Sequence, residues 1–151
     1  MMKQILSILM LIGAFAMNTN AQVKNPVQWS FTAKKITDKQ YELQFKATIQ
    51  PGWHIYTIDH KGDIGVATAV NIAKNPLGDK AGKVKVVGKA VTMKDPSTGE
   101  MVKFYENTVT LVQVVNLKAP VKTNFTGTVE YMACDDKMCL PPTEKPFTIS
   151  L

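Results

Sequence analysis

The stretch Tyr41-Glu42-Leu43-Gln44-Phe45-Lys46-Ala47-Thr48-Ile49 alternates strictly between apolar and polar side chains. Successive side chains of a β-strand point to opposite faces, so the apolar members of this stretch share one face and the polar members share the other. Such a strand has one buried side and one side in water, which is typical of an antiparallel sheet.

Comparable stretches recur along the chain, and no segment shows the sustained apolar spacing of three and four residues that marks a helix. The sequence predicts strands over residues 27–33, 41–49, 53–58, 67–73, 83–93, 103–117, 126–134 and 145–151. Turn residues separate them, and the less regular run from Val109 to Val115 predicts a central strand or a bulge near Gln113. Seven or eight short strands at this spacing predict an all-β chain, folded as an immunoglobulin-like antiparallel β-sandwich.

The N-terminus has the three parts of a secretion signal. Lys3 precedes an apolar run from Ile5 to Met17, which is followed by small and polar residues up to Ala21. The run is shorter than the ~20 residues that a membrane-spanning helix needs. We expect residues 1–21 to be a signal peptide and residues 22–151 to form one mature domain, soluble in a periplasm-like compartment.

The basic residues argue against nucleic-acid binding. The sequence has 18 basic and 12 acidic residues, and every basic residue is a lysine. Surfaces that bind nucleic acid usually cluster arginines, whose planar fork binds phosphate at two points. We therefore expect solvated lysines on strand faces and edges, and no nucleic-acid partner.

The two cysteines lie close together, in Cys134-Asp135-Asp136-Lys137-Met138-Cys139-Leu140-Pro141-Pro142. In an oxidising compartment, two cysteines at this spacing in a hairpin are expected to form a disulfide. The small ring would stabilise the fold by only about 2 kcal/mol, against ~4 to 5 kcal/mol for a bridge spanning a domain. The bond is either a local structural staple or an exchangeable redox pair. Its small effect on stability argues against a staple, but local structural disulfides are common, so the spacing alone leaves both alternatives open.

The surroundings of the two thiols predict different roles. Cys134 is followed by Asp135 and Asp136, whose negative charges oppose thiolate formation, whereas Cys139 follows Lys137 and precedes a proline-rich segment. We predict that Cys139 forms the mixed disulfide with a partner protein and that Cys134 resolves it.

Three segments carry a family resemblance. The most specific is the hairpin from Cys134 to Pro142, in which two cysteines flank a short polar loop and a Pro-Pro pair follows. The segment from Gln50 to Tyr56 has the pattern P-G-W-H-x-Y, and a further strand is predicted over the segment from Phe104 to Leu111. Together they resemble the N-terminal periplasmic domain of the transmembrane disulfide reductase DsbD, in which they correspond to the terminal hairpin, the early aromatic strand and the strand after the cap loop. The cysteine spacing is one residue shorter than in the best-known members.

The resemblance implies an immunoglobulin-like domain that relays electrons through Cys134 and Cys139. It implies thioredoxin-like or disulfide-isomerase-like proteins of the periplasm as partners, and no cofactor or metal. The family's membrane hub and C-terminal thioredoxin-like domain are not in this chain, so a separate membrane protein would supply the electrons. We expect the domain to be a monomer.

The resemblance also implies supporting residues around the disulfide. The cap loop corresponds to residues 93–102, where Asp95 or Glu100 would assist exchange. That loop has no aromatic residue at its tip, so Met93 or Met101 would shield the disulfide. Aromatic Trp53, Tyr56 and Tyr105 would surround the sulfurs or form a docking surface, or else belong to the ordinary sandwich core.

Two other functions are consistent with parts of the sequence. A non-catalytic, secreted binding module would hold a protein or glycan with its loops, and its disulfide would be structural. Metal binding through His54, His60 and the methionines is the weaker alternative, because two histidines six residues apart lack a recognised ligand pattern.

Overall fold

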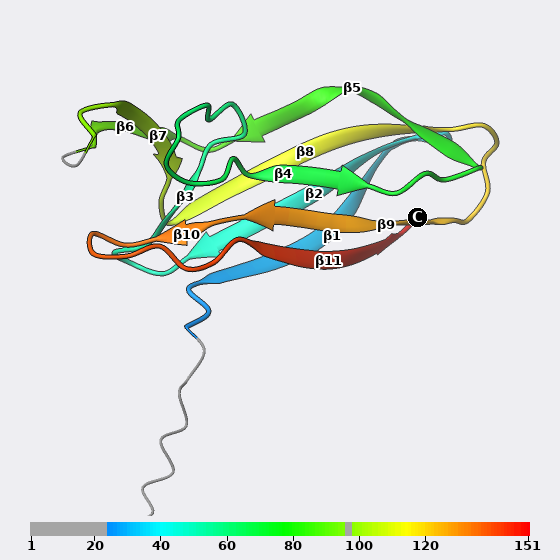
Figure 1. Ribbon diagram of the computed structural model, residues 1–151. Helices are drawn as coiled ribbons and strands as arrows, with labels where there is room; N and C mark the ends of the chain where they lie inside the picture. Colours follow the sequence, from blue (N-terminus) through cyan, green and yellow to red (C-terminus); the bar gives the residue numbers. More distant parts are fainter. Residues whose placement is uncertain (1–23, 96–97) are drawn as a thin grey trace, which may run out of the picture.

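A computed structural model describes residues 24–95 and 98–151, so the predicted signal peptide, residues 1–21, lies outside the described part. Within the described residues the chain forms eleven strands and no helix (Figure 1). This part of the chain therefore has no helix that could cross a membrane. The strands are β1 (Val27–Thr37), β2 (Gln40–Ile49), β3 (His54–Tyr56), β4 (Ala69–Ile72), β5 (Gly78–Val87), β6 (Ala90–Lys94), β7 (Met101–Tyr105), β8 (Thr108–Leu117), β9 (Asn124–Tyr131), β10 (Ala133–Cys134) and β11 (Thr143–Ser150).

The strands form three antiparallel sheets. Four strands in the order β1-β2-β8-β5 make one layer of the sandwich, and β11-β9-β4 make the facing layer. A third sheet, β10-β3-β7-β6, lies at one end of the molecule (Figure 1). The prediction of an all-β sandwich of antiparallel strands is therefore confirmed.

The alternating stretch that predicted the first buried strand is β2. Leu43 and Phe45 are fully buried on its inner face, and the ring of Phe45 meets that of Phe147 from β11 edge to face, with centroids 4.9 Å apart. Removing such side chains from water contributes about 1.5–3 kcal/mol each. The two layers thus enclose one main core, made of Val27, Leu43, Phe45, Ala47, Ile49, Ile55, Tyr105, Val109, Leu111, Val115, Leu117, Phe125, Val129, Tyr131, Ala133, Phe147 and Ile149.

The central strand and its irregularity are where the sequence predicted them. Strand β8 pairs with β2 on one side and with β5 on the other, and the register with β5 shifts between Ala81 and Lys85. Gln113 lies opposite this bulge, where its buried side-chain amide donates hydrogen bonds to the carbonyl oxygens of Ala81, Gly82 and Val114 at 2.9–3.3 Å. The side-chain amide of Gln113 thus supplies hydrogen bonds at the bulge, where the ladder of backbone hydrogen bonds is interrupted.

Three strands that the sequence predicted as continuous are each divided. The prediction over 83–93 becomes β5 and β6, separated at Gly88, and the prediction over 103–117 becomes β7 and β8, separated at Asn107. Both separating residues have positive φ, 147° and 60°. At both points the chain leaves one sheet for another, which requires a sharp change of direction. The predicted strand over 126–134 likewise divides into β9 and the short β10.

Candidate functional site

Cys134 and Cys139 form the predicted disulfide at the end of the molecule that carries the third sheet. Their Cα atoms are 4.0 Å apart, and the two residues face each other across a tight hairpin. The hairpin is closed by hydrogen bonds from Leu140 N to Ala133 O and from Asp135 N to Met138 O, at 2.8 and 2.9 Å. Strand β10 pairs with β3, which brings Cys134 opposite His54.

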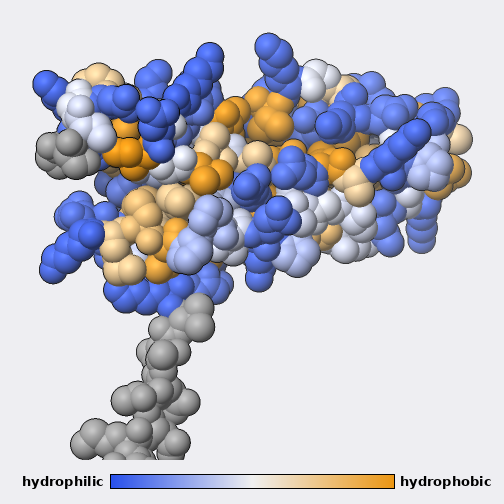
Figure 2. Space-filling model, in the orientation of Figure 1, coloured by the Kyte–Doolittle hydropathy of each residue, from blue (hydrophilic) through white to orange (hydrophobic). Residues whose placement is uncertain are grey.

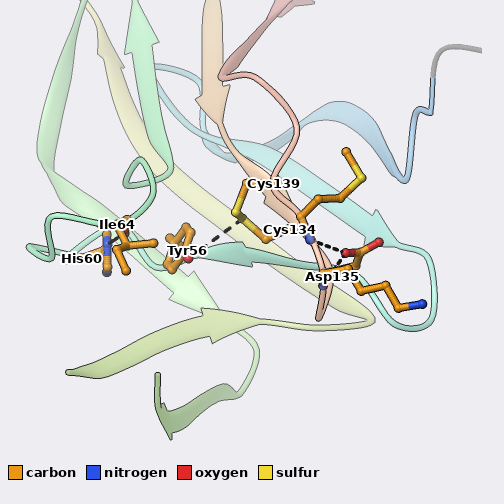
Figure 3. The surroundings of a disulfide bond; sticks show 8 residues. Tyr56, His60, Ile64, Cys134, Asp135 and Cys139 are labelled. Carbon is orange, nitrogen blue, oxygen red and sulfur yellow. Dashed lines mark hydrogen bonds between the residues drawn. A yellow bond between two sulfur atoms is a disulfide. The ribbon is translucent and has the colours of Figure 1, made fainter. Parts of the chain in front are cut away.

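The carboxylate of Asp135 shapes the turn between the cysteines. It accepts hydrogen bonds from the backbone N–H groups of Lys137 and Met138, both at 2.8 Å (Figure 3). These bonds favour the charged form and hold the pKa of Asp135 below its usual value. One of the two acidic residues after Cys134 is therefore engaged with the backbone of the turn.

The two sulfur-bearing residues differ in their access to solvent. Cys134 is only 2 % exposed, whereas Cys139 is exposed, as is the neighbouring Met138 at 46 %. Figure 2 shows apolar side chains gathered at the end of the molecule that carries this hairpin. An incoming thiolate can therefore approach Cys139 far more easily than Cys134.

Cys134 belongs to a second, smaller cluster of buried side chains, separate from the main core. This Cys134 cluster consists of Tyr56, Val102, Phe104 and Cys134, with half-buried Val91 and Met132 packed against it. Strand β3 supplies Tyr56, and β7 supplies Val102 and Phe104. The buried sulfur is therefore enclosed by side chains from the third sheet.

Tyr56 directs its hydroxyl group towards the buried sulfur, with its oxygen 4.0 Å from Cys134 Sγ (Figure 3). A disulfide sulfur carries no hydrogen, so the hydroxyl is the donor in this weak contact. Burial, together with the charge of Asp95, raises the pKa of Tyr56. The hydroxyl thus keeps its proton at neutral pH and remains available as a donor.

His54 lies on the neighbouring part of β3. Its ring contacts that of Phe104, with centroids 4.4 Å apart. Burial lowers the pKa of His54, and the charges of Glu106, Asp136 and Asp135 oppose this effect only in part. The imidazole is therefore held in its neutral form as part of the packing beside the disulfide.

Two of the aromatic residues predicted around the sulfurs lie in the main core. Tyr105 is buried there, in register with Ile55, and half-buried Trp53 packs against the same core. The ammonium group of Lys24 lies 5.4 Å from the centre of the Trp53 ring. The structure thus brings Tyr56 to the disulfide and places Trp53 and Tyr105 with the sandwich interior.

The predicted cap loop joins β6 to β7. The carboxylate of Asp95 accepts hydrogen bonds from Thr98 N and the Thr98 hydroxyl at 2.9 and 3.2 Å. Its negative charge contributes to the raised pKa of Tyr56. Glu100 instead lines a pocket of about 370 Å³ together with His60. Residues 96–97 lie outside the described part of the chain.

The methionines of this loop were predicted to shield the disulfide, but both are exposed, Met93 at 41 % and Met101 at 65 %. The side chains of β7 that pack around Cys134 are instead Val102 and Phe104, neither of which is among the predicted supporting residues. The two-residue period of the strand was a usable signal, because it puts Val102 and Phe104 on one face and Tyr105 on the other.

Among the residues that the structure describes, no group of three or more histidine, cysteine or acidic side chains is arranged to hold a metal ion.

Comparison with known proteins gives a family match over most of the chain. Residues 20–151 match the family model described as the N-terminal domain of the thiol:disulfide interchange protein DsbD. No curated protein sequence matches the chain.

Three solved structures share the fold at low sequence identity. The N-terminal periplasmic domain of ScsB from Proteus mirabilis has a TM-score of 0.58 at 16 % identity. The match covers 85 % of this chain and 47 % of the ScsB chain, so this chain spans about half the length of the ScsB chain. The reduced DsbD N-terminal domain of Neisseria meningitidis has a TM-score of 0.51 at 17 % identity, covering 82 % and 85 % of the two chains. The same kind of domain, in a complex with the N-terminal domain of PilB from that organism, has a TM-score of 0.52 at 14 % identity, covering 84 % and 87 %. These likenesses confirm the immunoglobulin-like form of the sandwich.

Proposed function

The chain belongs to the family of N-terminal domains of the thiol:disulfide interchange protein DsbD, and on this premise we propose that it relays electrons by thiol–disulfide exchange at Cys134 and Cys139. The observation that carries the proposal is the unequal access to the two sulfurs, with Cys139 exposed and Cys134 buried. A structural staple has no need of such asymmetry, whereas an exchange reaction requires one sulfur to be attacked and the other to leave.

Reduction of the pair begins when a partner thiolate attacks Cys139 Sγ. A bond forms between that sulfur and the partner, the Cys134–Cys139 bond breaks, and Cys134 leaves with the electron pair as a thiolate. The Tyr56 hydroxyl, 4.0 Å from Cys134 Sγ in the disulfide form, is placed to donate a hydrogen bond to this developing charge. A second thiol of the partner then attacks the mixed disulfide and releases Cys139.

Delivery of the electrons follows the reverse course. The Cys139 thiolate attacks the disulfide of an acceptor and forms a mixed disulfide, releasing one acceptor thiolate. Cys134 then attacks Cys139 Sγ, restores the internal disulfide and releases the second acceptor thiolate, so two electrons pass to the acceptor. In both directions the exposed sulfur meets the partner and the buried sulfur reacts only within the domain.

The partners that we propose are a membrane reductase hub as donor and thioredoxin-like or disulfide-isomerase-like proteins as acceptors. The complex of a DsbD N-terminal domain with the PilB N-terminal domain supports a protein partner for a domain of this fold. We place the reaction in the periplasm, after removal of residues 1–21, because the related ScsB domain is periplasmic and the disulfide requires an oxidising compartment.

Trapping of mixed disulfides in periplasmic extract tests the proposal. A Cys134→Ser variant should accumulate a covalent complex with a thioredoxin-like protein, because the resolving thiol is gone. A Cys139→Ser variant is the matched control and should trap little, since its remaining thiol is buried. The reverse pattern would overturn the assignment of the two sulfurs.

The reduction potential of the pair distinguishes exchange from a structural bridge. We expect a value in the range of exchange proteins, about −120 to −270 mV. A potential below about −300 mV, with no trapped partner, would instead support the binding-module alternative.

A further inference from the structure

The ring of Tyr56 is held from the side opposite the disulfide. Figure 3 shows Tyr56 between Cys134 and His60. The imidazole of His60 stacks on the phenol ring, with centroids 4.3 Å apart and planes inclined by 28°. His60 is predicted from the sequence only as a weak candidate metal ligand, whereas in the structure it contacts the residue that faces the buried sulfur.

His60 is itself fixed in the loop of residues 57–68, which joins β3 to β4. Its Nε2 lies 2.6 Å from the carbonyl oxygen of Ile64, and because that oxygen can only accept, Nε2 is the donor. Its backbone N–H donates to Thr57 O at 3.2 Å, which closes a turn. The loop therefore holds the imidazole at both its ring and its backbone.

The same loop leaves no space for the phenol ring to move towards Gly65. Gly65 has φ of +86°, and a Cβ atom built there would overlap Cε2 of the Tyr56 ring. The Thr68 hydroxyl donates to Tyr56 O at 2.6 Å and so fixes the backbone of the tyrosine. Backbone, ring face and ring edge of Tyr56 are thus each in contact with the 57–68 loop.

We propose that His60 is a positioning residue for the exchange reaction, whose imidazole holds the Tyr56 phenol so that its hydroxyl is already in place when Cys134 leaves as a thiolate. This inference rests on the proposed function and deepens it.

The contact gains its importance only as charge develops on the sulfur. In the disulfide the sulfur is neutral and the contact is weak, at 4.0 Å, whereas a thiolate accepts a much stronger, charge-assisted hydrogen bond. An interaction stronger in the transition state than in the ground state accelerates the reaction. A donor already held in position avoids the entropic cost of ordering a freely rotating ring at that moment.

Reduction of the protein by dithiothreitol provides the test, followed by acid quenching and counting of labelled thiols. We expect His60→Ala to slow reduction by about three- to tenfold, the range for loss of much of a charge-assisted hydrogen bond. His60→Phe retains an aromatic ring for stacking and should recover a rate within about twofold of the wild type. Lys61→Ala, an exposed neighbour in the same loop, is the matched control and should react like the wild type.

A second histidine variant separates stacking from folding of the loop. His60→Gln can keep a hydrogen bond to Ile64 O but has no ring, so it should be as slow as His60→Ala while keeping the loop closed. A wild-type rate in this variant and in His60→Ala would overturn the proposal.

The decisive comparison combines His60→Ala with Tyr56→Phe. If His60 acts only through the phenol, His60→Ala should cause no further slowing in the Tyr56→Phe background. Equal slowing in both backgrounds would refute the positioning role. Failure of the proposed function is distinct, because there the wild-type pair would have the low reduction potential of a structural disulfide and trap no partner protein, whatever residue 60 is.

Discussion

The hydroxyl oxygen of Tyr56 lies 4.0 Å from Cys134 Sγ, the buried sulfur of the disulfide. Replacing Tyr56 by Phe removes this donor and keeps the ring. We expect reduction by dithiothreitol to slow about tenfold, because a hydrogen bond to a charged group contributes roughly 1.5 kcal/mol or more to the transition state. Tyr41→Phe, a change to a half-buried tyrosine packed against the main core, should leave the rate unaltered. Equal rates for wild type and Tyr56→Phe would show that the contact has no role.

Removing the disulfide should have little effect on the fold. The ring it closes is small, with a sequence separation of five residues, so a Cys134→Ala, Cys139→Ala double variant should lose only about 2 kcal/mol of unfolding free energy. Phe45→Ala, which empties a fully buried site in the main core, should lose ~3–5 kcal/mol. Denaturant unfolding of both variants checks the contrast. A larger loss in the cysteine variant than in Phe45→Ala would mark the bond as structural.

The turn between the cysteines should weaken in acid. The backbone hydrogen bonds to Asp135 lower its pKa in the folded protein below the ordinary value of 3.8, so the unfolded chain takes up a proton first as the pH falls. The stabilising effect is therefore complete above the ordinary pKa and is lost as the pH falls through the lowered value. Asp135→Asn keeps an acceptor oxygen but does not titrate in this range. Urea unfolding between pH 6 and pH 2 should show a smaller acid-induced loss in this variant than in the wild type.

His54 should contribute its own pH dependence at a higher pH. Burial lowers its pKa below the ordinary value of 6.5, so the unfolded protein binds the proton more readily than the folded one. Stability should consequently decline as the pH falls from about 7 through 6.5 and on towards the lowered folded pKa. His54→Phe keeps a ring against Phe104 and removes the titration. The decline between pH 7 and pH 5 should be smaller in His54→Phe, and an equal decline in both proteins would contradict this origin.

The parts of the fold that the sequence predicted are those with a local periodic signal. The alternation from Tyr41 to Ile49 identified a strand with one buried face, and it forms β2. The close spacing of Cys134 and Cys139 predicted their disulfide, which needs only a hairpin between them. The division at Asn107 had only a weak signal, because a single asparagine, although it adopts the left-handed conformation more readily than most residues, marks a turn less specifically than glycine or proline.

The surroundings of the disulfide were less predictable because they depend on contacts between distant segments. Tyr56 lies beside the buried sulfur, whereas the neighbouring aromatic residue from β7 is Phe104 and not Tyr105. The two-residue period places Phe104 and Tyr105 on opposite faces of β7, but it does not say which face lies towards Cys134. The contact of His60 with Tyr56 depends on the path of the loop over residues 57–68, which composition does not determine. Contacts between segments far apart in the sequence depend on the three-dimensional fold, so a local sequence pattern does not identify them.

Separation of the Cys134 cluster from the main core has a consequence for the redox cycle. Opening and closing the bond changes the covalent connections only at the hairpin, and the side chains between the two layers of the sandwich form a separate cluster, so we expect them to keep their neighbours. Backbone amide hydrogens of β2 and β8 are therefore expected to exchange with deuterium equally slowly in both redox states, whereas those of the hairpin exchange faster after reduction. The sandwich is thus expected to keep its structure while the disulfide at its end opens and closes.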